Sequence, residues 1–321
     1  MERHMVQTLI EIDGRIADAL RAAFRIGATR PAPAPGQHDE VANFAAVLLA
    51  PRDDGGCEPM DCDKPVPPGG LRMMFDSCYI PDHGEDAHFG NAYAGVVGVA
   101  DGVGSYRGRG VDASAFARGL MSSAHAEVVT AAPGTQFCPR TLLERAHHAT
   151  AAAGTPAAST AVIVSLAGRT LRWAYVGDSG FAVFRDGRML RRSQAQQHHF
   201  NCPYQLNSKR DGIRVAMAAE VGEVPAKDGD IVVVGTDGLF DNVTDDELER
   251  IVRMGTALGF SPTNMAEVVA GFAFEASRCS YRDTPYSVLG RREPGKGFFT
   301  GGKRDDITVT PLLSSTSYHN S

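Results

Sequence analysis

The chain has 321 residues, of which 43% are hydrophobic and 22% charged, and its formal net charge is −6. This length can bury the core of one large domain or two small ones, and the acidic balance disfavours a non-specific nucleic-acid binder, which needs a basic surface to neutralise phosphates. The 6 cysteines form no CxxC pair, which disfavours a structural zinc site and indicates reduced intracellular thiols.

The first 40 residues predict a unit separate from the rest of the chain. Apolar residues from Leu9 to Phe24 recur on one side of an amphipathic helix, and the proline- and alanine-rich segment 28–37 predicts a stiff linker. The arginines of this region are typical of an organellar transit peptide, but Glu11 and Asp13 are acids that such peptides avoid. We therefore expect a helix and linker over 1–40 and a main domain over 41–321. We expect a cytoplasmic location, with mitochondria as the alternative.

From Leu71 the sequence changes to short apolar strands separated by glycine turns. A strand over 93–100 should end at Asp101, and Asp112 predicts the N-cap of a helix that runs to Thr130. The longest uncharged stretch, 146–168, contains histidine, glycine and proline, so it predicts loop plus strand and no membrane span. Three strands then follow, separated by hairpin turns at Gly168-Arg169 and Asp186-Gly187: 160–166, 171–176 and 181–185.

The second half of the chain alternates further strands with helices. A buried strand over 231–234 leads to Asp237, Thr244 and Glu247 fit a capping box that opens a helix, and Ser261-Pro262 opens another that reaches about Cys279. A last strand covers 307–313. Consecutive strands mixed with helix pairs favour an α+β sandwich over a parallel βαβ sheet.

Four aspartates lie close to the ends of apolar runs: Asp101, Asp178, Asp237 and Asp305. Strand ends that face the same way would gather their carboxylates, and such a cluster needs divalent cations or partial protonation. A single Asp-Gly after a strand is usually only a turn. From spacing alone, a catalytic cluster and a set of separate turns both stay open.

The motifs that surround these aspartates resemble those of one enzyme family. The segments VGVADGVGSY, AASTAVIV, AYVGDSG, GDIVVVGTDGLFDNV and DDITV stand in the order found in metal-dependent serine/threonine protein phosphatases of type 2C. The pieces GVDASAFARGL, QQHHFNCPYQL and GGKRDDITV are most similar to the T-cell activation phosphatase branch, which has mitochondrial members. The resemblance covers about residues 75–313 and implies a central antiparallel β-sandwich flanked by helices. It also implies two Mn²⁺ or Mg²⁺ ions per subunit, with a weaker third.

The resemblance assigns roles position by position. It makes Asp101 the bridging metal ligand, gives Gly102 a metal-binding carbonyl oxygen, and makes Asp237 and Asp305 the remaining direct ligands. Glu85 and Asp86 match an acidic pair that contacts the ions largely through water, and Asp178 matches the site of the third ion. Asp306, where the family often has asparagine, is a secondary candidate.

Two departures from the family pattern concern catalysis. Val103 replaces a histidine proposed in the family as a general acid, as it does in the T-cell activation branch, and Pro81 stands where a phosphate-binding arginine is usual. Arg107 or Arg109 is therefore our candidate for the phosphate contact, against a solvated loop as the alternative. His83 and His88 are nearby acid candidates, against surface or core packing as the alternative for both.

The resulting hypothesis is hydrolysis of phosphoserine or phosphothreonine by a metal-activated water, with Asp101 and Asp237 essential, on a phosphoprotein substrate and by a monomer. No cysteine lies in a CxxxxxR phosphate loop, which argues against a cysteine nucleophile. A pseudophosphatase that only binds proteins is the main alternative, and a metal-dependent nuclease is a third, disfavoured by the acidic charge. Segment 193–222 corresponds to the family's variable flap, where substrate choice should be encoded.

Overall fold

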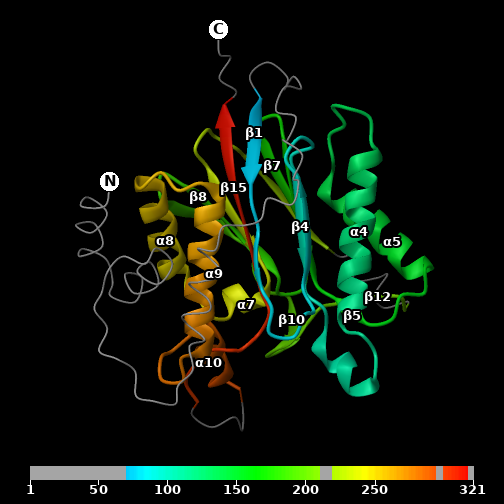
Figure 1. Cartoon of the computed structure of the whole chain (residues 1–321), viewed down its shortest axis with the longest axis vertical. Helices are drawn as coiled ribbons and strands as arrows, with labels where there is room; N and C mark the ends of the chain where they lie inside the picture. The colour runs from blue at the N-terminus through cyan, green and yellow to red at the C-terminus, as the bar shows by residue number, and fades with distance from the viewer. Residues whose placement is uncertain (1–69, 210–218, 294–298, 317–321) are drawn as a thin grey trace, which may run out of the picture.

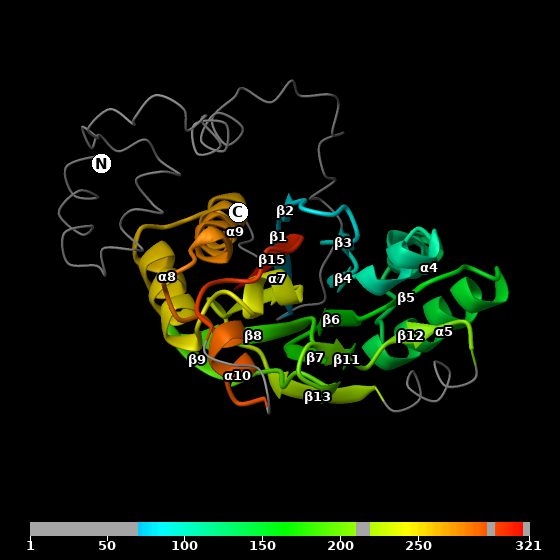
Figure 2. The same cartoon turned by 90° about the horizontal axis from the view of Figure 1, so that it is seen from below.

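The computed structural model describes residues 70–209, 219–293 and 299–316. Two antiparallel β-sheets pack face to face, and a pair of helices covers the outer face of each (Figures 1 and 2). This arrangement confirms the expected α+β fold with a central antiparallel sandwich. The expected N-terminal helix and its linker lie outside the described residues.

The first sheet carries α8 and α9 on its outer face, and the second carries α4 and α5 (Figure 2). The first sheet has the order β1-β15-β14-β8-β9, with β2 also paired to β15: β1 (Leu71–Phe75), β15 (Ile307–Thr316), β14 (Ile231–Gly235), β8 (Gly180–Arg185), β9 (Arg188–Arg192) and β2 (Cys78–Ile80). The second sheet has the order β13-β7-β6-β4-β3: β13 (Glu220–Pro225), β7 (Thr170–Val176), β6 (Ala161–Ala167), β4 (Val96–Ala100) and β3 (Ala87–Asn91).

Short elements complete the described part of the chain. Two small strand pairs join β10 (Gln197–His199) to β11 (Cys202–Pro203) and β12 (Leu206–Asn207) to β5 (Ala158–Ser159). The helices are η1 (Gly104–Arg109), α4 (Ser114–Thr130), α5 (Pro139–Ala152), α7 (Asp237–Phe240), α8 (Asp245–Ala257), α9 (Pro262–Arg278) and α10 (Pro285–Gly290). No helix in these ranges is long and apolar enough to cross a membrane.

The apolar runs of the sequence become central strands because both faces of each sheet are covered. In β14, Val232 and Val234 point into the core between the sheets, whereas Ile231 and Val233 point to the helices α8 and α9. Alternate residues of a strand face opposite sides, so a continuous apolar run satisfies two cores at once. All five residues of β14 are buried.

Several local predictions are confirmed. The turn residues Gly168, Asp186 and Gly187 all have positive φ, between 52° and 69°, as tight hairpin turns require. Thr244 and Glu247 form a complete capping box at the start of α8, and the Ser261 side chain accepts a hydrogen bond from the Asn264 N–H at the start of α9.

Three local predictions are wrong in detail. The strand expected from residue 93 begins at Val96, because residues 92–95 form a turn closed by the Gly95 N–H and the Ala92 carbonyl. Asp112 does not cap α4: Ala113 is the N-cap, although the Asp112 carboxylate accepts the Ser114 N–H. Residues 146–152, expected as loop, are the last two turns of α5, which begins with Pro139 in its first turn.

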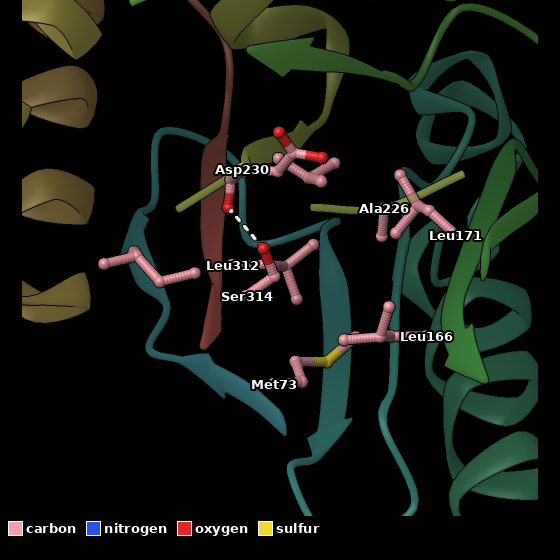
Figure 3. A pocket seen from close by; sticks show the side chains of 9 residues that line it. Met73, Leu166, Leu171, Ala226, Asp230, Leu312 and Ser314 are labelled. Atoms are coloured by element: carbon pink, nitrogen blue, oxygen red, sulfur yellow. Dashed lines mark hydrogen bonds between the residues drawn. The ribbon is translucent and has the colours of Figure 1, made fainter. Parts of the chain in front are cut away.

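A small apolar pocket lies between the two sheets (Figure 3). Met73, Leu166, Leu171 and Leu312 contribute apolar side chains, and the Ser314 hydroxyl donates to the Asp230 carbonyl oxygen over 3.1 Å. These residues lie where β6, β13 and β15 end and β14 begins. The strand ends that carry the predicted metal ligands lie at the other end of the sandwich, so this pocket is separate from the candidate site.

Candidate metal centre

The predicted site residues follow or precede strands that terminate at one end of the sandwich, where α7 lies in Figure 1. Asp101 follows β4, Asp178 joins β7 to β8, Asp237 opens α7 directly after β14, and Asp305 precedes β15. Antiparallel neighbours run in opposite directions, so the end of β14 and the beginnings of β8 and β15 meet there. The topology therefore collects four aspartates that are up to 204 residues apart in the sequence.

Asp101 lies within the electrostatic influence of the other acids. Burial, together with the negative charges of Asp237 and Asp86, raises the pKa of Asp101 well above its usual value. Its backbone is fixed to the neighbouring strand, since the Asp101 N–H donates to Thr160 Oγ1 (3.2 Å) and the Thr160 N–H donates to the Asp101 carbonyl (2.9 Å). Asp101 thus lies at the same end of the sandwich as Asp86 and Asp237, and its role as a metal ligand stays a prediction.

Gly102 lies in a backbone cradle that has no room for a side chain. A Cβ atom there would overlap the Ala113 carbonyl oxygen and come within 2.9 Å of the Glu85 carbonyl oxygen. The Gly102 N–H donates to that same Glu85 carbonyl over 3.2 Å. Glycine is needed here for close backbone approach, and this approach brings the two acidic loops side by side.

Asp86 is held by hydroxyl groups that flank the other acids. Thr236 Oγ1 and Thr308 Oγ1 donate to Asp86 Oδ2 over 2.8 and 2.7 Å. Thr236 directly precedes Asp237, so this contact sets the two carboxylates next to each other. Burial raises the pKa of Asp86 well above its usual value, against the opposing effect of the two hydroxyl donors.

Asp306 anchors the loop that carries the acidic pair, and this position was only a secondary candidate from the sequence. Its Oδ1 accepts the N–H groups of Asp82 (2.5 Å), His83 (2.7 Å) and Gly84 (3.0 Å), and its Oδ2 accepts those of Glu85 and Asp86. Burial would raise the pKa of Asp306, but these backbone donors outweigh burial and lower it. Both oxygens face the loop, so Asp306 acts as its anchor.

The two candidate arginines occupy different positions. Arg107 Nε lies 3.1 Å from Glu85 Oε1, and about half of the Arg107 side chain is exposed. Burial raises the pKa of Glu85, and Arg107 opposes that shift. Arg109 is exposed and stacks over the Tyr106 ring at 5.3 Å. Arg107 is thus placed beside the acidic pair.

Asp178 connects the cluster to the segment expected as the flap. Gln197 Nε2 donates to Asp178 Oδ2 over 2.8 Å. Burial, followed by the charge of Asp237, raises the pKa of Asp178 to about 8. His198 packs against Tyr204 with ring centroids 4.4 Å apart, and His199 is exposed.

Two members of the cluster were missed by the sequence analysis, Asp241 and Lys303. Lys303 Nζ lies 3.1 Å from Asp241 Oδ2 and 3.0 Å from Asp305 Oδ2, and it also contacts Asp237 Oδ2. Burial, together with the charge of Asp237, raises the pKa of Asp241 to about 6, against the opposing effect of Lys303. A usable signal for Asp241 was its spacing of four residues from Asp237, which places both acids on one side of a helical turn.

The donor set fits hard divalent cations. Carboxylate oxygens are the ligands that Mn²⁺ and Mg²⁺ prefer, and among the described residues Asp86 Oδ1, Asp178 Oδ1 and Asp237 Oδ1 are buried with no hydrogen-bond partner. Such orphaned oxygens are costly unless a ligand satisfies them. As the side chains stand in the described ranges, no three of their His, Cys, Asp or Glu residues converge closely enough to hold an ion.

Known proteins that are similar to this chain point to one family. Residues 82–269 match the family model "Protein phosphatase 2C". The chain is 55% identical to "Putative protein phosphatase 2C 24" of Oryza sativa subsp. japonica over 94% of this chain and 96% of that protein. The solved photosystem II phosphatase PBCP is 30% identical, with a TM-score of 0.64 over 75% of this chain and 98% of that one.

A more distant solved structure shares the fold alone. The catalytic domain of the serine/threonine phosphatase PstP is 15% identical, with a TM-score of 0.53 over 77% of this chain and all of that one. The family match covers more than half of the chain, and the rice relative is similar from end to end. The chain therefore belongs to the protein phosphatase 2C family.

Proposed function

We propose that the chain hydrolyses phosphoserine and phosphothreonine in protein substrates at the acidic end of the sandwich. The observation that carries this proposal is the gathering of Asp86, Asp101, Asp237 and Asp305 at one end of the sandwich, where Asp86 Oδ1 and Asp237 Oδ1 are buried without a hydrogen-bond partner. Family membership supports a phosphoprotein as the substrate. A protein kept only for binding has no need of such a cluster, so we do not favour the pseudophosphatase alternative.

We propose Asp101, the Gly102 carbonyl, Asp237 and Asp305 as direct metal ligands, with Glu85 and Asp86 in contact through water. When bound, two Mn²⁺ or Mg²⁺ ions would polarise the phosphate and lower the pKa of the attacking water. The PstP domain, which has the same fold, is in complex with two manganese ions. Asp178 is our candidate for a weaker third ion, since one of its oxygens is unpartnered.

The protein residues around the ions would position the acids and the substrate. Asp306 holds the loop of Glu85 and Asp86 in place through backbone N–H groups. Arg107 is our candidate for the phosphate contact, because it is half-exposed and lies beside the acidic pair. Arg109 packs on Tyr106 and is the weaker candidate.

The test is phosphate release from a phosphoserine or phosphothreonine peptide in the presence of Mn²⁺. Asp101→Asn and Asp237→Asn should each abolish release, because each removes a negative charge from the proposed ligand set while keeping the side chain's size. Normal turnover by either variant would refute the assignment. DNA and RNA offered under the same conditions test the nuclease alternative. A well-folded protein that fails to bind Mn²⁺ in calorimetry would favour the pseudophosphatase.

The finer predictions from the sequence are kept as proposals of the same kind. They are membership of the T-cell activation branch, a monomeric state and a cytoplasmic location with mitochondria as the alternative. Light scattering of the purified full chain tests the oligomeric state, and a fluorescent fusion of the full chain tests the location.

A further inference from the structure

We propose that Lys303 is an internal cation that competes with the divalent ions for the carboxylates of the metal centre and thereby limits how tightly the chain binds metal. This inference rests on the proposed function, since it concerns the same acids. It goes beyond that function by assigning a role to a residue that supplies no ligand atom.

The ammonium group of Lys303 occupies the middle of the cluster. Its three donors face three carboxylates: Asp237 Oδ2, Asp241 Oδ2 at 3.1 Å and Asp305 Oδ2 at 3.0 Å. Only 14% of the Lys303 side chain is exposed. Two of these acids, Asp237 and Asp305, are the proposed direct ligands, so the lysine and a metal ion would bind the same two carboxylate groups.

The backbone fixes the lysine in this position. The Lys303 N–H donates to Asn242 Oδ1 over 2.8 Å, and Asn242 Nδ2 donates to the Lys303 carbonyl over 2.8 Å. The same Nδ2 donates to the Gly238 carbonyl over 2.9 Å, and Asn242 is fully buried. Lys303 is therefore tied to the segment that carries Asp237 and Asp241, unlike a surface lysine that meets an acid by chance.

Charge repulsion opposes the binding of both cations to these carboxylates at once. An ammonium and a divalent ion that share carboxylates repel each other at a separation of a few ångströms, where screening by water is weak in a buried site. Metal loading must therefore displace the ammonium from Asp237 and Asp305. The free energy needed for that displacement weakens the binding of the ion.

The first test compares Mn²⁺ binding by calorimetry in the full chain and in Lys303→Gln. Losing the competing charge should tighten binding at least about tenfold, equal to about 1.4 kcal/mol. Lys303→Arg keeps the charge and should stay within about threefold of the wild type. The matched control is Lys227→Gln, which removes a lysine from the opposite end of the sandwich and should leave the affinity unchanged.

Each outcome separates this inference from the proposed function. Wild-type protein that neither binds Mn²⁺ nor releases phosphate would overturn the proposed function. Wild-type protein that binds Mn²⁺ while Lys303→Gln binds equally or more weakly would overturn the competition and leave the function standing.

A second measurement on the wild-type chain covers the case in which Lys303→Gln does not fold. Reductive methylation, read by peptide mass spectrometry, reports how accessible each lysine amine is. Lys303 should be protected in EDTA, where three carboxylates surround it, and should react faster in Mn²⁺ once displaced, while Lys227 should react equally in both. No change, or greater protection in Mn²⁺, would overturn the proposal.

Discussion

Replacing Asp306 tests whether a single carboxylate fixes the loop that carries the acidic pair. In Asp306→Asn, one side-chain oxygen remains as an acceptor, but the other becomes an NH₂ donor. If the remaining oxygen keeps the N–H groups of His83 and Gly84, the new donor faces the N–H groups of Glu85 and Asp86, which lose their acceptor. The opposite orientation strands the other donors, so neither rotamer satisfies the loop.

The magnitude follows from the count of lost hydrogen bonds. Hydrogen bonds to a charged acceptor contribute about 1.5–3 kcal/mol each, and two are lost. Part of that loss is offset, because removing the Asp306 charge relieves a repulsion that raises the pKa of Asp86. We therefore expect a loss of about 2–4 kcal/mol in the free energy of unfolding. At about 2–4 °C per kcal/mol for a domain of this size, Tm should fall by about 5–15 °C.

The assay is urea unfolding of Asp306→Asn and wild type in EDTA. The pKa of Asp306 is lowered in the folded chain, so its carboxylate stabilises the fold above the unfolded pKa of about 3.9 and loses that effect as the pH falls through the folded value. The deficit of the variant should be full at pH 7 and should shrink below about pH 4. Asp186→Asn, in an exposed turn where asparagine is tolerated, is the control. An Asp306→Asn deficit within about 0.5 kcal/mol of that control would refute the anchoring role.

Three further predictions concern the same end of the sandwich. Gly102→Ala should lower the free energy of unfolding by about 2–4 kcal/mol and weaken Mn²⁺ binding, because its Cβ would overlap the Ala113 carbonyl. The control is Gly108→Ala, whose Cβ would meet no atom within 4 Å and which should be nearly neutral in both measurements. Arg107→Gln should raise KM for a phosphopeptide about tenfold or more, because a charged phosphate contact is lost, and Arg109→Gln should change it less than twofold; equal effects would contradict the assignment. In EDTA, the free energy of unfolding should fall as the pH rises from about 4 to about 8, because the pKa of Asp178 is about 8 in the folded chain and the unfolded chain releases this proton at lower pH. Urea unfolding at pH 5, 6.5 and 8 should show this fall, and saturating Mn²⁺ should reduce it.

Local signals in the sequence were sufficient for most strands and turns. The buried strand β14 is recognisable from its continuous apolar run, and the Asp186-Gly187 turn from two residues that tolerate a positive φ. Both signals lie within a few neighbouring residues. The start of α4 is not fixed by its local sequence, so the prediction that Asp112 is the N-cap is wrong. The Asp112 carboxylate accepts the Ser114 N–H and contacts Arg118, and Ala113 is the N-cap. The end of α5 was read as loop because glycine and proline follow it closely in the sequence.

The site divides in the same way. The proposed ligands Asp101, Asp237 and Asp305 each stand beside an apolar run, which is a local property, and their roles were assigned from the resemblance of the surrounding motifs. Lys303 has no comparable local pattern, because its partner Asp237 is 66 residues away in the sequence. Hydrogen bonds between Asn242 and both the N–H and the carbonyl of Lys303 hold the lysine near Asp237. The anchoring role of Asp306 needs the loop 82–86, more than 200 residues earlier.

Asp305 links the two devices that make this acidic cluster compatible with a folded chain. Its Oδ2 contacts Lys303, and its Oδ1 accepts the Asp306 N–H over 3.0 Å. Clustered carboxylates with little access to water would otherwise repel one another and remain protonated, yet a protonated site cannot hold a divalent ion. Lys303 supplies a positive charge that can be displaced. The Asp306 carboxylate accepts hydrogen bonds from backbone N–H groups and thereby keeps the loop of Glu85 and Asp86 in place. Because one device competes with the metal and the other does not, removing Lys303 should tighten metal binding and removing the Asp306 charge should loosen it.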